Sequence, residues 1–237
     1  MDSKKLFGKK ALLDNIDFID YVILINKDNS LINLLNQKQI KYQFINKQYF
    51  NKFDHSLNHQ GIVSFLKQPK SINNLDDFLK LSKDKSIVLI IDSIQDPQNF
   101  GAILRTCDAF NVDAVIYKKD NQVQINDFVI KSSMGAINYL NMIRVSNLSN
   151  IVQVLKKAGY WIYASSLDKE SKDFSNIKFE KKSVLIVGNE QNGISPLLLK
   201  QADFLINIPM HGHMQSLNVS VATGILLNKI KKSFKKI

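Results

Sequence analysis

Cysteine and arginine are scarce in this chain. Of its 237 residues only Cys107 is cysteine, so no disulfide can form within the chain and no zinc site can be built from several thiolates. A single cysteine is typical of a protein in a reducing compartment. Arg105 and Arg144 are the two arginines among 32 basic residues, and all the others are lysine. An arginine here therefore indicates a position that needs a planar guanidinium.

Long apolar runs and the common ligand motifs of α/β proteins are also missing. No run approaches the ~18 residues that cross a bilayer, and the first ten residues lack the apolar stretch of a signal peptide. We therefore expect a cytoplasmic protein without a membrane anchor. There is no G-x-G-x-x-G after a strand, no P-loop and no G-x-S-x-G elbow. His211-Gly-His213 has no cysteine or acidic neighbours, so we expect no metal.

The charge that is present is strongly positive. The net charge is +11, with +5 in residues 1–70, +2 in residues 71–185 and +4 in residues 186–237. A basic balance concentrated at the two ends favours a polyanionic partner, either nucleic acid or an anionic membrane. A composition rich in lysine, isoleucine and asparagine explains the same excess, so charge alone leaves the partner open.

The pattern of apolar residues predicts two α/β units. Residues 1–66 predict helices at 11–16 and 31–36 and strands at 21–25, 42–45 and 61–66. Residues 67–74 are polar and contain Pro69, which indicates a linker. From residue 76, apolar strands at 87–92, 114–117, 140–145, 160–164, 183–187 and 204–208 alternate with helices at 100–110, 127–137, 151–158, 196–201 and 219–234. This alternation predicts a mostly parallel sheet with both faces covered. We place the domains at 1–70 and 85–237, with 71–84 as linker and lead-in.

Three polar loops follow predicted strands, at the edge where α/β sheets bind ligands. In the first, residues 92–101, Asn99 is a plausible N-cap, and the helix that follows bears Arg105, either a phosphate contact or a surface charge. The second, residues 188–193, has two glycines and one of the three glutamates, Glu190. In the third, residues 208–222, Ser216 or Asn218 can cap the last helix. The lysines at the end of that helix fit solubility as well as RNA contact.

Read together, these segments resemble the TrmH-like branch of the SPOUT superfamily, the RNA ribose 2′-O-methyltransferases. The matching segments are DSIQDPQNFGAILRTCDAFNVDAVI, LIVGNEQNGIS and INIPMHGHMQSLNVSVATGILL, and KSSMGA at residues 131–136 is similar to a further family segment. Their order and separation match over roughly residues 84–232. FGKKALLDNI and HQGIV resemble the small RNA-recognition domain that precedes the catalytic domain in the ribosomal-RNA members.

The resemblance implies an α/β trefoil knot, with the segment from about Gly188 to Val221 threaded through a chain loop and S-adenosylmethionine bound in the cleft. By resemblance, the cofactor contacts are Gly188, Ile208 and Leu217, and the catalytic and active-site positions are Asn99, Arg105, Glu190, Ser216 and Asn218. Members pair through the knot region, so a homodimer is expected, with Arg105 serving across the interface. The HGHM stretch before Gln215 is richer in histidine than the branch's pattern.

We therefore expect a cytoplasmic enzyme that methylates the 2′-hydroxyl of a guanosine in 23S ribosomal RNA. A guanidinium that stays charged is a poor base, so docking phosphate and orienting the hydroxyl are the expected roles of Arg105, with Glu190 orienting it. Residues 1–66 are expected to recognise RNA without catalysing. A transfer-RNA methyltransferase of the same branch stays open. So does a non-catalytic RNA-binding ribosome-assembly factor, although the intact set of site residues argues against it.

Overall fold

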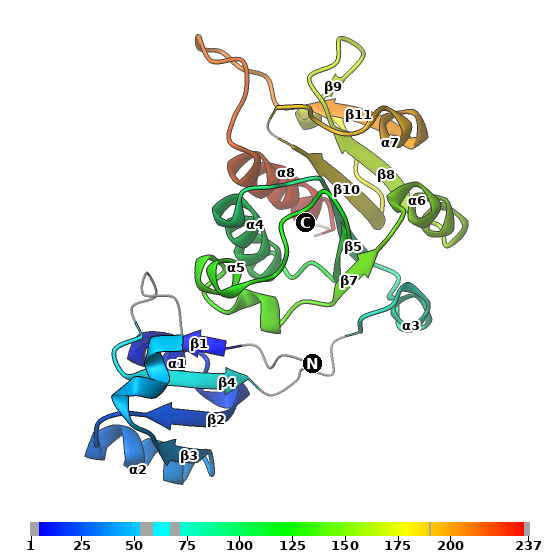
Figure 1. The fold of residues 1–237 in the computed structure, drawn as a ribbon. Helices are drawn as coiled ribbons and strands as arrows, with labels where there is room; N and C mark the ends of the chain where they lie inside the picture. Colours follow the sequence, from blue (N-terminus) through cyan, green and yellow to red (C-terminus); the bar gives the residue numbers. More distant parts are fainter. Residues whose placement is uncertain (1–4, 53–58, 67–71, 190, 235–237) are drawn as a thin grey trace.

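The computed structural model describes residues 5–52, 59–66, 72–189 and 191–234, which form two sheets with their own helices (Figure 1). The first unit is built around a four-stranded sheet with the order β1-β4-β2-β3. Its elements are β1 (Lys5–Phe7), α1 (Lys9–Asp14), the 3₁₀ turn η1 (Ile16–Phe18), β2 (Ile19–Leu24), α2 (Asn29–Gln37), β3 (Lys41–Phe44), η2 (Lys47–Lys52) and β4 (Ile62–Leu66).

The small sheet is mixed rather than parallel. β2 and β3 run parallel, whereas β4 pairs antiparallel with β1 and β2. The predicted helices and strands of this unit are confirmed, with boundaries shifted by up to two residues. β1 was not predicted, because a three-residue strand is too short to show an alternating pattern.

The second unit is built around a seven-stranded sheet with the order β7-β6-β5-β10-β8-β11-β9, and every strand pair in it is parallel. The prediction of a mostly parallel sheet is confirmed. The strands are β5 (Ser86–Asp92), β6 (Ala114–Lys118), β7 (Met142–Val145), β8 (Trp161–Ser165), β9 (Lys172–Asp173), β10 (Lys182–Gly188) and β11 (Phe204–Asn207). The helical elements are α3 (Leu75–Lys80), α4 (Pro97–Ala109), α5 (Asp127–Ser132), η3 (Ala136–Asn138), α6 (Leu148–Lys157), η4 (Phe174–Asn176), α7 (Pro196–Gln201) and α8 (Val219–Ser233).

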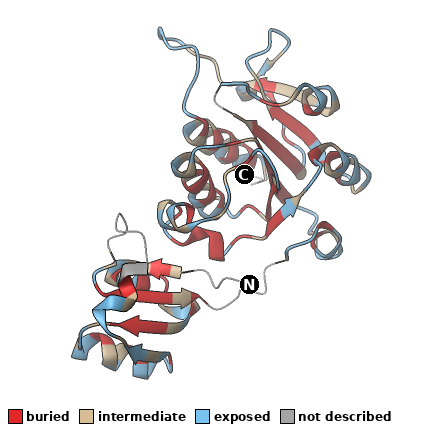
Figure 2. Ribbon diagram, viewed as in Figure 1, coloured by how far each residue is buried: buried red, intermediate tan, exposed pale blue. Residues whose placement is uncertain are grey.

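Alternate residues of the central strands face two separate apolar layers. In β5, Ile87, Leu89 and Ile91 pack with α4, α5 and α8, whereas Val88 and Ile90 pack with α3, α6 and α7. The strands are therefore buried on both faces, as Figure 2 shows for β5 and β10. This two-sided burial explains why the strands read as continuous apolar runs in the sequence.

Two predictions about the helices were wrong. The N-cap of α4 is Asp96, whose side chain accepts a hydrogen bond from the backbone N–H of Gln98. Asn99 therefore lies inside the first turn rather than at the cap. The helix predicted over residues 127–137 stops at Ser132, because Met134 and Gly135 adopt left-handed φ angles of 50° and 84°. Most of the predicted linker, residues 67–71, lies outside the described residues.

The two units touch at α5 and η3. α5 contacts β1, and the rings of Phe18 and Tyr139 meet edge to face with their centroids 4.4 Å apart. Gly135 packs so closely on Asn15 that a Cβ at Gly135 would collide with the Asn15 amide. The domain boundaries proposed at residues 70 and 85 stay a prediction.

Candidate functional site

The predicted site lies between β5 and β10, where the chain connections of the large sheet run outward in opposite directions. β5 leads to β6 and β7 on one side, while β10 and the strands beyond it lie on the other. Asp92 and Gly188 are register partners at the carboxyl ends of β5 and β10. Open α/β sheets bind ligands outside the carboxyl ends of strands at such a switch point. The first and second predicted loops both begin there.

A buried ion pair holds the floor of this switch point. Asp92 is 1% exposed and pairs with the Lys118 ammonium at 2.7 Å. It also accepts a hydrogen bond from the backbone N–H of Ser195 at 2.8 Å, which ties the end of the second loop to β5. Burial alone would raise the pKa of Asp92, but the hydrogen bonds from Lys118 and Ser195 outweigh it and hold that pKa below its ordinary value. Sequence reasoning missed Lys118, because nothing distinguishes it from the other lysines of the chain.

The second loop doubles back on itself within a few residues. The backbones of Asn189 and Gly193 exchange hydrogen bonds of 3.0 and 2.8 Å, and the Asn189 side chain donates to the carbonyl of Ser93 at 3.0 Å. A Cβ at Gly188 would collide with the carbonyl of Gly193, and Gly193 has a left-handed φ of 66°. Both glycines are therefore required by the backbone: Gly188 lets Gly193 pack directly against the end of β10, and Gly193 supplies the left-handed turn.

The third loop is exposed until it reaches α8. Residues 211–218 are all exposed, and Asn218 ends the loop as the N-cap of α8 by accepting from the backbone N–H of Ser220 at 2.9 Å. The prediction that Asn218 or Ser216 caps this helix is confirmed for Asn218. The Asn218 amide also donates to Oδ1 of Asn99 at 2.9 Å. Because Asp96 and not Asn99 caps α4, the Asn99 side chain is placed to join the first loop to the third.

The structure does not bring every predicted residue into this contact. Arg105 is exposed and makes no hydrogen bond or ion pair with the described residues. Six residues separate it from Asn99, which places the two side chains about 120° apart around α4. Ser216 is exposed in the third loop, and Glu190 lies outside the described residues. The structure thus shows Asn99 and Asn218 together, and leaves the roles of Arg105, Glu190 and Ser216 as predictions.

The three residues predicted to contact a cofactor are spread along the strand ends. Gly188 ends β10, Ile208 follows β11, and Leu217 is 39% exposed in the third loop. β8 lies between β10 and β11, so Gly188 and Ile208 are separated by two strand spacings, about 10 Å. Half-buried Ser165 and Ser166, at the end of β8, occupy the interval. Two polar residues after an apolar strand were a signal for this position that sequence reasoning did not use.

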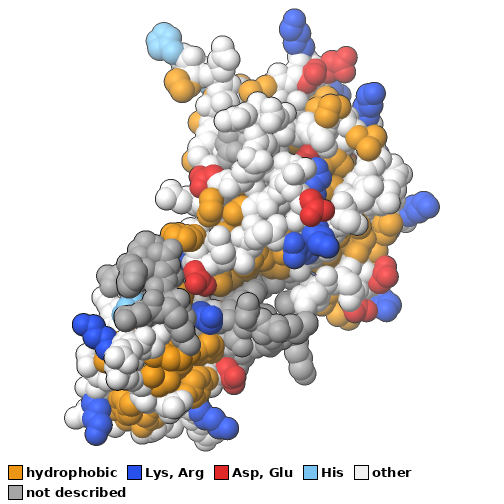
Figure 3. All heavy atoms as spheres, viewed as in Figure 1, with side chains coloured by type: hydrophobic (Ala, Val, Ile, Leu, Met, Phe, Trp, Pro, Cys, Tyr) orange, Lys and Arg blue, Asp and Glu red, His pale blue; other side chains and the backbone are white. Residues whose placement is uncertain are grey.

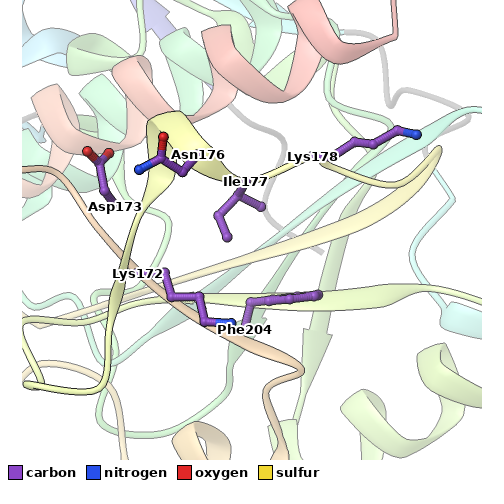
Figure 4. A pocket seen from close by; sticks show the side chains of 6 residues that line it. All are labelled: Lys172, Asp173, Asn176, Ile177, Lys178 and Phe204. Carbon is purple, nitrogen blue, oxygen red and sulfur yellow. The ribbon is translucent and has the colours of Figure 1, made fainter.

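A hollow of about 600 Å³ lies near one edge of the same sheet (Figure 4). Its lining comes from β9, η4 and β11, and none of the predicted site residues contributes. The Lys172 ammonium lies over the Phe204 ring, 5.8 Å from its centroid. Asp173, which also lines the hollow, lies in β9 directly opposite Asn207 of β11, the residue before Ile208. The hollow therefore borders the start of the third loop without being part of the Asn99–Asn218 contact.

Membrane-spanning helices and metal-binding clusters do not occur among the described residues. Within residues 5–52, 59–66, 72–189 and 191–234, no helix is long and apolar enough to cross a membrane. The same described ranges contain no group of three or more histidine, cysteine or acidic residues able to hold a metal ion. His211 and His213 are exposed in the third loop. Cys107 is fully buried in α4, and burial raises the pKa of its thiol well above the ordinary value.

Comparison with known proteins connects these loops to one family. Residues 86–228 match the SpoU rRNA methylase family, and residues 9–71 match the RNA 2′-O ribose methyltransferase substrate-binding family. The chain belongs to the SpoU rRNA methylase family. A family member of Mycoplasma pneumoniae, named an uncharacterized tRNA/rRNA methyltransferase, is 41% identical over 229 residues, which cover 94% of each chain. A counterpart with the same kind of name from Borreliella burgdorferi is 38% identical over 216 residues, covering 87% of this chain and 93% of that one.

Solved structures of SpoU and TrmH proteins share the architecture. The SpoU methyltransferase AviRb of Streptomyces viridochromogenes, crystallised with its cofactor AdoMet, superposes with a TM-score of 0.78 at 18% identity, covering 97% of this chain and 89% of that one. The TrmH/SpoU tRNA modifying enzyme of A. aeolicus has a TM-score of 0.58 at 34% identity, covering 67% of this chain and 81% of that one. The first likeness establishes the two-unit fold, and the second is closer in sequence over a smaller part of the chain.

Proposed function

We propose that this SpoU family RNA methyltransferase transfers a methyl group from S-adenosylmethionine to the ribose 2′-hydroxyl of a guanosine in 23S ribosomal RNA. The observation that carries the proposal is the convergence of the three loops at the sheet's switch point. The Asn99–Asn218 hydrogen bond joins the first loop to the third. Asn189 and Ser195 join the second loop to Ser93 and Asp92. The match to a 2′-O ribose methyltransferase substrate-binding family supports the ribose hydroxyl as the acceptor.

The ends of β10, β8 and β11 fit the cofactor. Gly188 keeps the second loop folded tightly on the end of β10, because the backbone of Gly193 fills the space where a Cβ would lie, and this packing would fix the loop beside the cofactor. Gly188 and Ile208 would hold the cofactor from two sides, and Leu217 would close over it from the exposed loop. S-adenosylmethionine supplies a methyl group that its positively charged sulfur activates for transfer. The chain must therefore provide orientation, exclusion of water and removal of one proton from the hydroxyl.

The polar side chains of the site divide that work between them. Asn99 and Asn218 form an amide pair that would hydrogen-bond the ribose, and Ser216 lies two residues away from Asn218. Arg105 would dock a phosphate and orient the hydroxyl through a two-pronged contact. Glu190 would orient Arg105.

A homodimer belongs to the same proposal. An apolar groove of about 480 Å³ runs between α4 and α8, lined by Thr106, Phe110, Ser220, Val221, Gly224, Ile225 and Asn228. Val221 is 50% exposed in this groove, and Arg105 is the neighbour of Thr106 at its border. A second copy seated here would cover the apolar surface and bring Arg105 to the site of its partner. Val221→Glu should abolish the dimer in sedimentation, whereas Val154→Glu, on exposed α6, should leave it intact.

The proposal extends to the class of RNA that is methylated, to a knot in the chain and to the place of the protein in the cell. Ribosomal RNA is favoured because the segments FGKKALLDNI and HQGIV resemble the RNA-recognition domain of the ribosomal-RNA members, and residues 9–71 match a substrate-binding family. Transfer RNA is the alternative, since the relatives are named tRNA/rRNA methyltransferases and the A. aeolicus structure is a tRNA modifying enzyme. A trefoil knot over about Gly188 to Val221 and a cytoplasmic location complete the proposal.

The decisive experiment offers the purified protein both RNA classes with isotope-labelled S-adenosylmethionine. We expect label in unmodified 23S ribosomal RNA, in one alkali-resistant dinucleotide that contains a ribose-methylated guanosine. Label in transfer RNA alone would move the function to the alternative. Binding of both cofactor and RNA without transfer would indicate a non-catalytic assembly factor. A parallel reaction with chelator should proceed unchanged.

A further inference from the structure

Three sequence segments that the catalytic site does not use meet in one groove between the two units. The groove, of about 360 Å³, lies between β1 and α1 on one side and α5 on the other (Figure 1). We call it the junction groove. It is lined by Lys5, Leu6, Phe7, Gly8, Lys10, Ala11, Asp14, Asn15, Gln60, Asp127, Ile130, Lys131 and Met134. These residues come from FGKKALLDNI, HQGIV and KSSMGA and from the residues flanking them.

The backbone beside the groove adopts an uncommon conformation at Met134. Met134 has a φ of 50°, a left-handed conformation that a side chain with a Cβ rarely adopts. It stands 45% exposed on the groove wall next to Gly135. At the floor, Asn15 is 2% exposed, and its amide packs against Gly135, so the end of α1 and the turn after α5 are in close contact. A left-handed backbone at a residue other than glycine is a cost that points to a function.

The lining matches the chemistry of a nucleotide. Ile130 and exposed Met134 give an apolar wall for a base. Lys10 and Lys131 are exposed ammonium groups for its phosphates. Neither lysine makes a hydrogen bond or an ion pair with the described residues. The volume lies in the ~300–1,000 Å³ range of small-ligand sites, which suits one nucleotide rather than a duplex. Proteins that bind single-stranded RNA combine such apolar and basic surfaces.

On the face of the molecule that Figure 3 shows, the basic side chains do not form one broad patch for RNA. In the view of Figure 3, basic side chains are spread singly over both units, with acidic side chains among them. On that face, an RNA strand would therefore be held by local sites such as the junction groove.

The groove is rigidly connected to the catalytic contact. Ser132, the last residue of α5, donates its hydroxyl to the carbonyl of Pro97 at 3.0 Å. A Cβ at Gly101 would collide with the same Ser132 side chain, so α5 and the first turn of α4 are in close contact. Asn99 lies in that turn. One helix, about 10 Å across, thus separates the groove from the Asn99–Asn218 pair.

We propose that the junction groove binds one unpaired nucleotide of the substrate RNA, close along the strand to the nucleotide that is methylated. This inference rests on the proposed function for its link to methylation, but the binding itself can be measured without transfer. The nucleotide packs its base on Met134 and places its phosphates at Lys10 and Lys131. Its base edge offers hydrogen-bonding atoms to Gln60.

The test measures binding of a fluorescent single-stranded oligouridine to the full chain by anisotropy over a series of salt concentrations. Lys10→Glu and Lys131→Glu should each weaken binding by about tenfold at low salt, and each should reduce the slope of log K against log salt by about 0.7. Lys157→Glu, an exposed lysine on α6 with the same change of charge, is the matched control and should change binding by less than about twofold. Cofactor binding should be equal in all four proteins.

A second measurement uses the same oligonucleotide with 4-thiouridine and maps the photo-crosslinked peptide. We expect the crosslink at Met134, which is exposed on the groove wall. If Lys10→Glu and Lys131→Glu bind like Lys157→Glu and the crosslink falls elsewhere, the groove is only a joint between the units and the proposal is wrong. A duplex of the same length that binds equally well and loses the same affinity would also overturn it. Failure of methyl transfer with groove binding intact would contradict the proposed function alone.

Discussion

The loops that follow β5 and β10 differ from the loop that follows β11 in how the chain holds them. In the first two, buried Asp92 binds Lys118 and Ser195, and Asn189 binds the backbone of Ser93. In the third, residues 211–218 are exposed, and Asn218 alone hydrogen-bonds the rest of the described chain. One side of the site is therefore held in place by contacts within the single chain, whereas the other side still has apolar surface to bury.

The exposed side chains of the third loop show what it lacks. Met214 is 76% exposed and Leu217 is 39% exposed. Burial of one such apolar side chain stabilises a protein by roughly 1.5–3 kcal/mol. A cofactor or a second protomer that covers them would therefore order the loop with a gain of that size. The following predictions test the fixed side and the exposed side separately, in decreasing order of effect.

The largest effect is expected at Gly188, on the fixed side. In Gly188→Ala the new Cβ collides with the backbone of Gly193, which cannot rotate away as a side chain could. The second loop must shift, and we expect the affinity for the cofactor to fall by about 100-fold or more. A loss of ~2.7 kcal/mol in binding free energy corresponds to a 100-fold loss of affinity. Calorimetric titration with S-adenosylmethionine measures it.

Gly212→Ala provides the control on the exposed side. No atom lies within 4 Å of a Cβ at Gly212. This variant should bind the cofactor like the wild type. Equal loss in both variants would mean that the third loop is as constrained as the second, and the comparison would fail.

The second effect concerns Arg105, which no described residue fixes. If it docks a phosphate or orients the hydroxyl, a lysine cannot replace it, because a compact ammonium lacks the planar fork. Arg105→Lys should leave folding and cofactor binding nearly intact while single-turnover methyl transfer falls by on the order of 10²-fold. Arg144→Lys is the control. Arg144 is an exposed residue of β7 that donates to Gln124 at 2.7 Å, and its replacement by lysine should change the rate little. Equal rates for both variants would make Arg105 an ordinary surface charge.

The fixed side of the site shows where sequence reasoning succeeds. The strand ends were predictable, because strands buried on both faces leave long apolar runs that stop at Asp92 and Gly188. The parallel order of the strands followed from the helices between them. The cap of α8 at Asn218 was also predictable, since few residue types serve as caps.

Other features of the site could not be predicted, because they depend on contacts between distant residues or on a choice between two suitable residues. Asp96 and Asn99 are both good caps three residues apart, and Pro97 at the first helical position decides for Asp96. Lys118 becomes special only because β6 lies beside β5. The separation of Arg105 from Asn99 reflects where each falls around α4, and the proposed homodimer would bring the Arg105 of one chain to the Asn99 of the other.

The third effect is a pH-dependent loss of stability on breaking the buried pair. Lys118→Met leaves Asp92 buried without its cation, which should cost about 2–3 kcal/mol at neutral pH, less than for a fully buried pair because the Lys118 side chain is 26% exposed. In the wild type the lowered pKa of Asp92 stabilises the fold above about pH 4, and this contribution is lost as the pH falls through that lowered pKa. In the variant burial dominates and raises the pKa of Asp92, so protonation relieves the cost. The difference in unfolding free energy between the wild type and Lys118→Met should therefore become smaller as the pH is lowered.

Urea unfolding at neutral pH and at about pH 5 measures this gap. Lys119→Met, one residue away and exposed, is the matched control and should differ from the wild type by less than ~0.5 kcal/mol at both pH values. A gap that stays constant with pH would show that Asp92 is not the group left uncompensated. The cofactor KM should rise about tenfold in Lys118→Met, because Ser195 and the second loop lose their anchor.

The smallest effect separates the two roles of Asn218, which caps α8 and binds Asn99. Serine and asparagine are equally good caps, so Asn218→Ser should keep the stability of the wild type, whereas Asn218→Ala should lose about 1 kcal/mol. Neither variant can donate an amide hydrogen bond to Asn99, so both should transfer methyl groups about tenfold more slowly, as expected for a lost hydrogen bond of roughly 1.4 kcal/mol. Thermal unfolding and single-turnover transfer on the same samples give the two readouts. If Asn218→Ser recovers the rate along with the stability, the cap alone matters, and the third loop reaches the site through α8 rather than through Asn99.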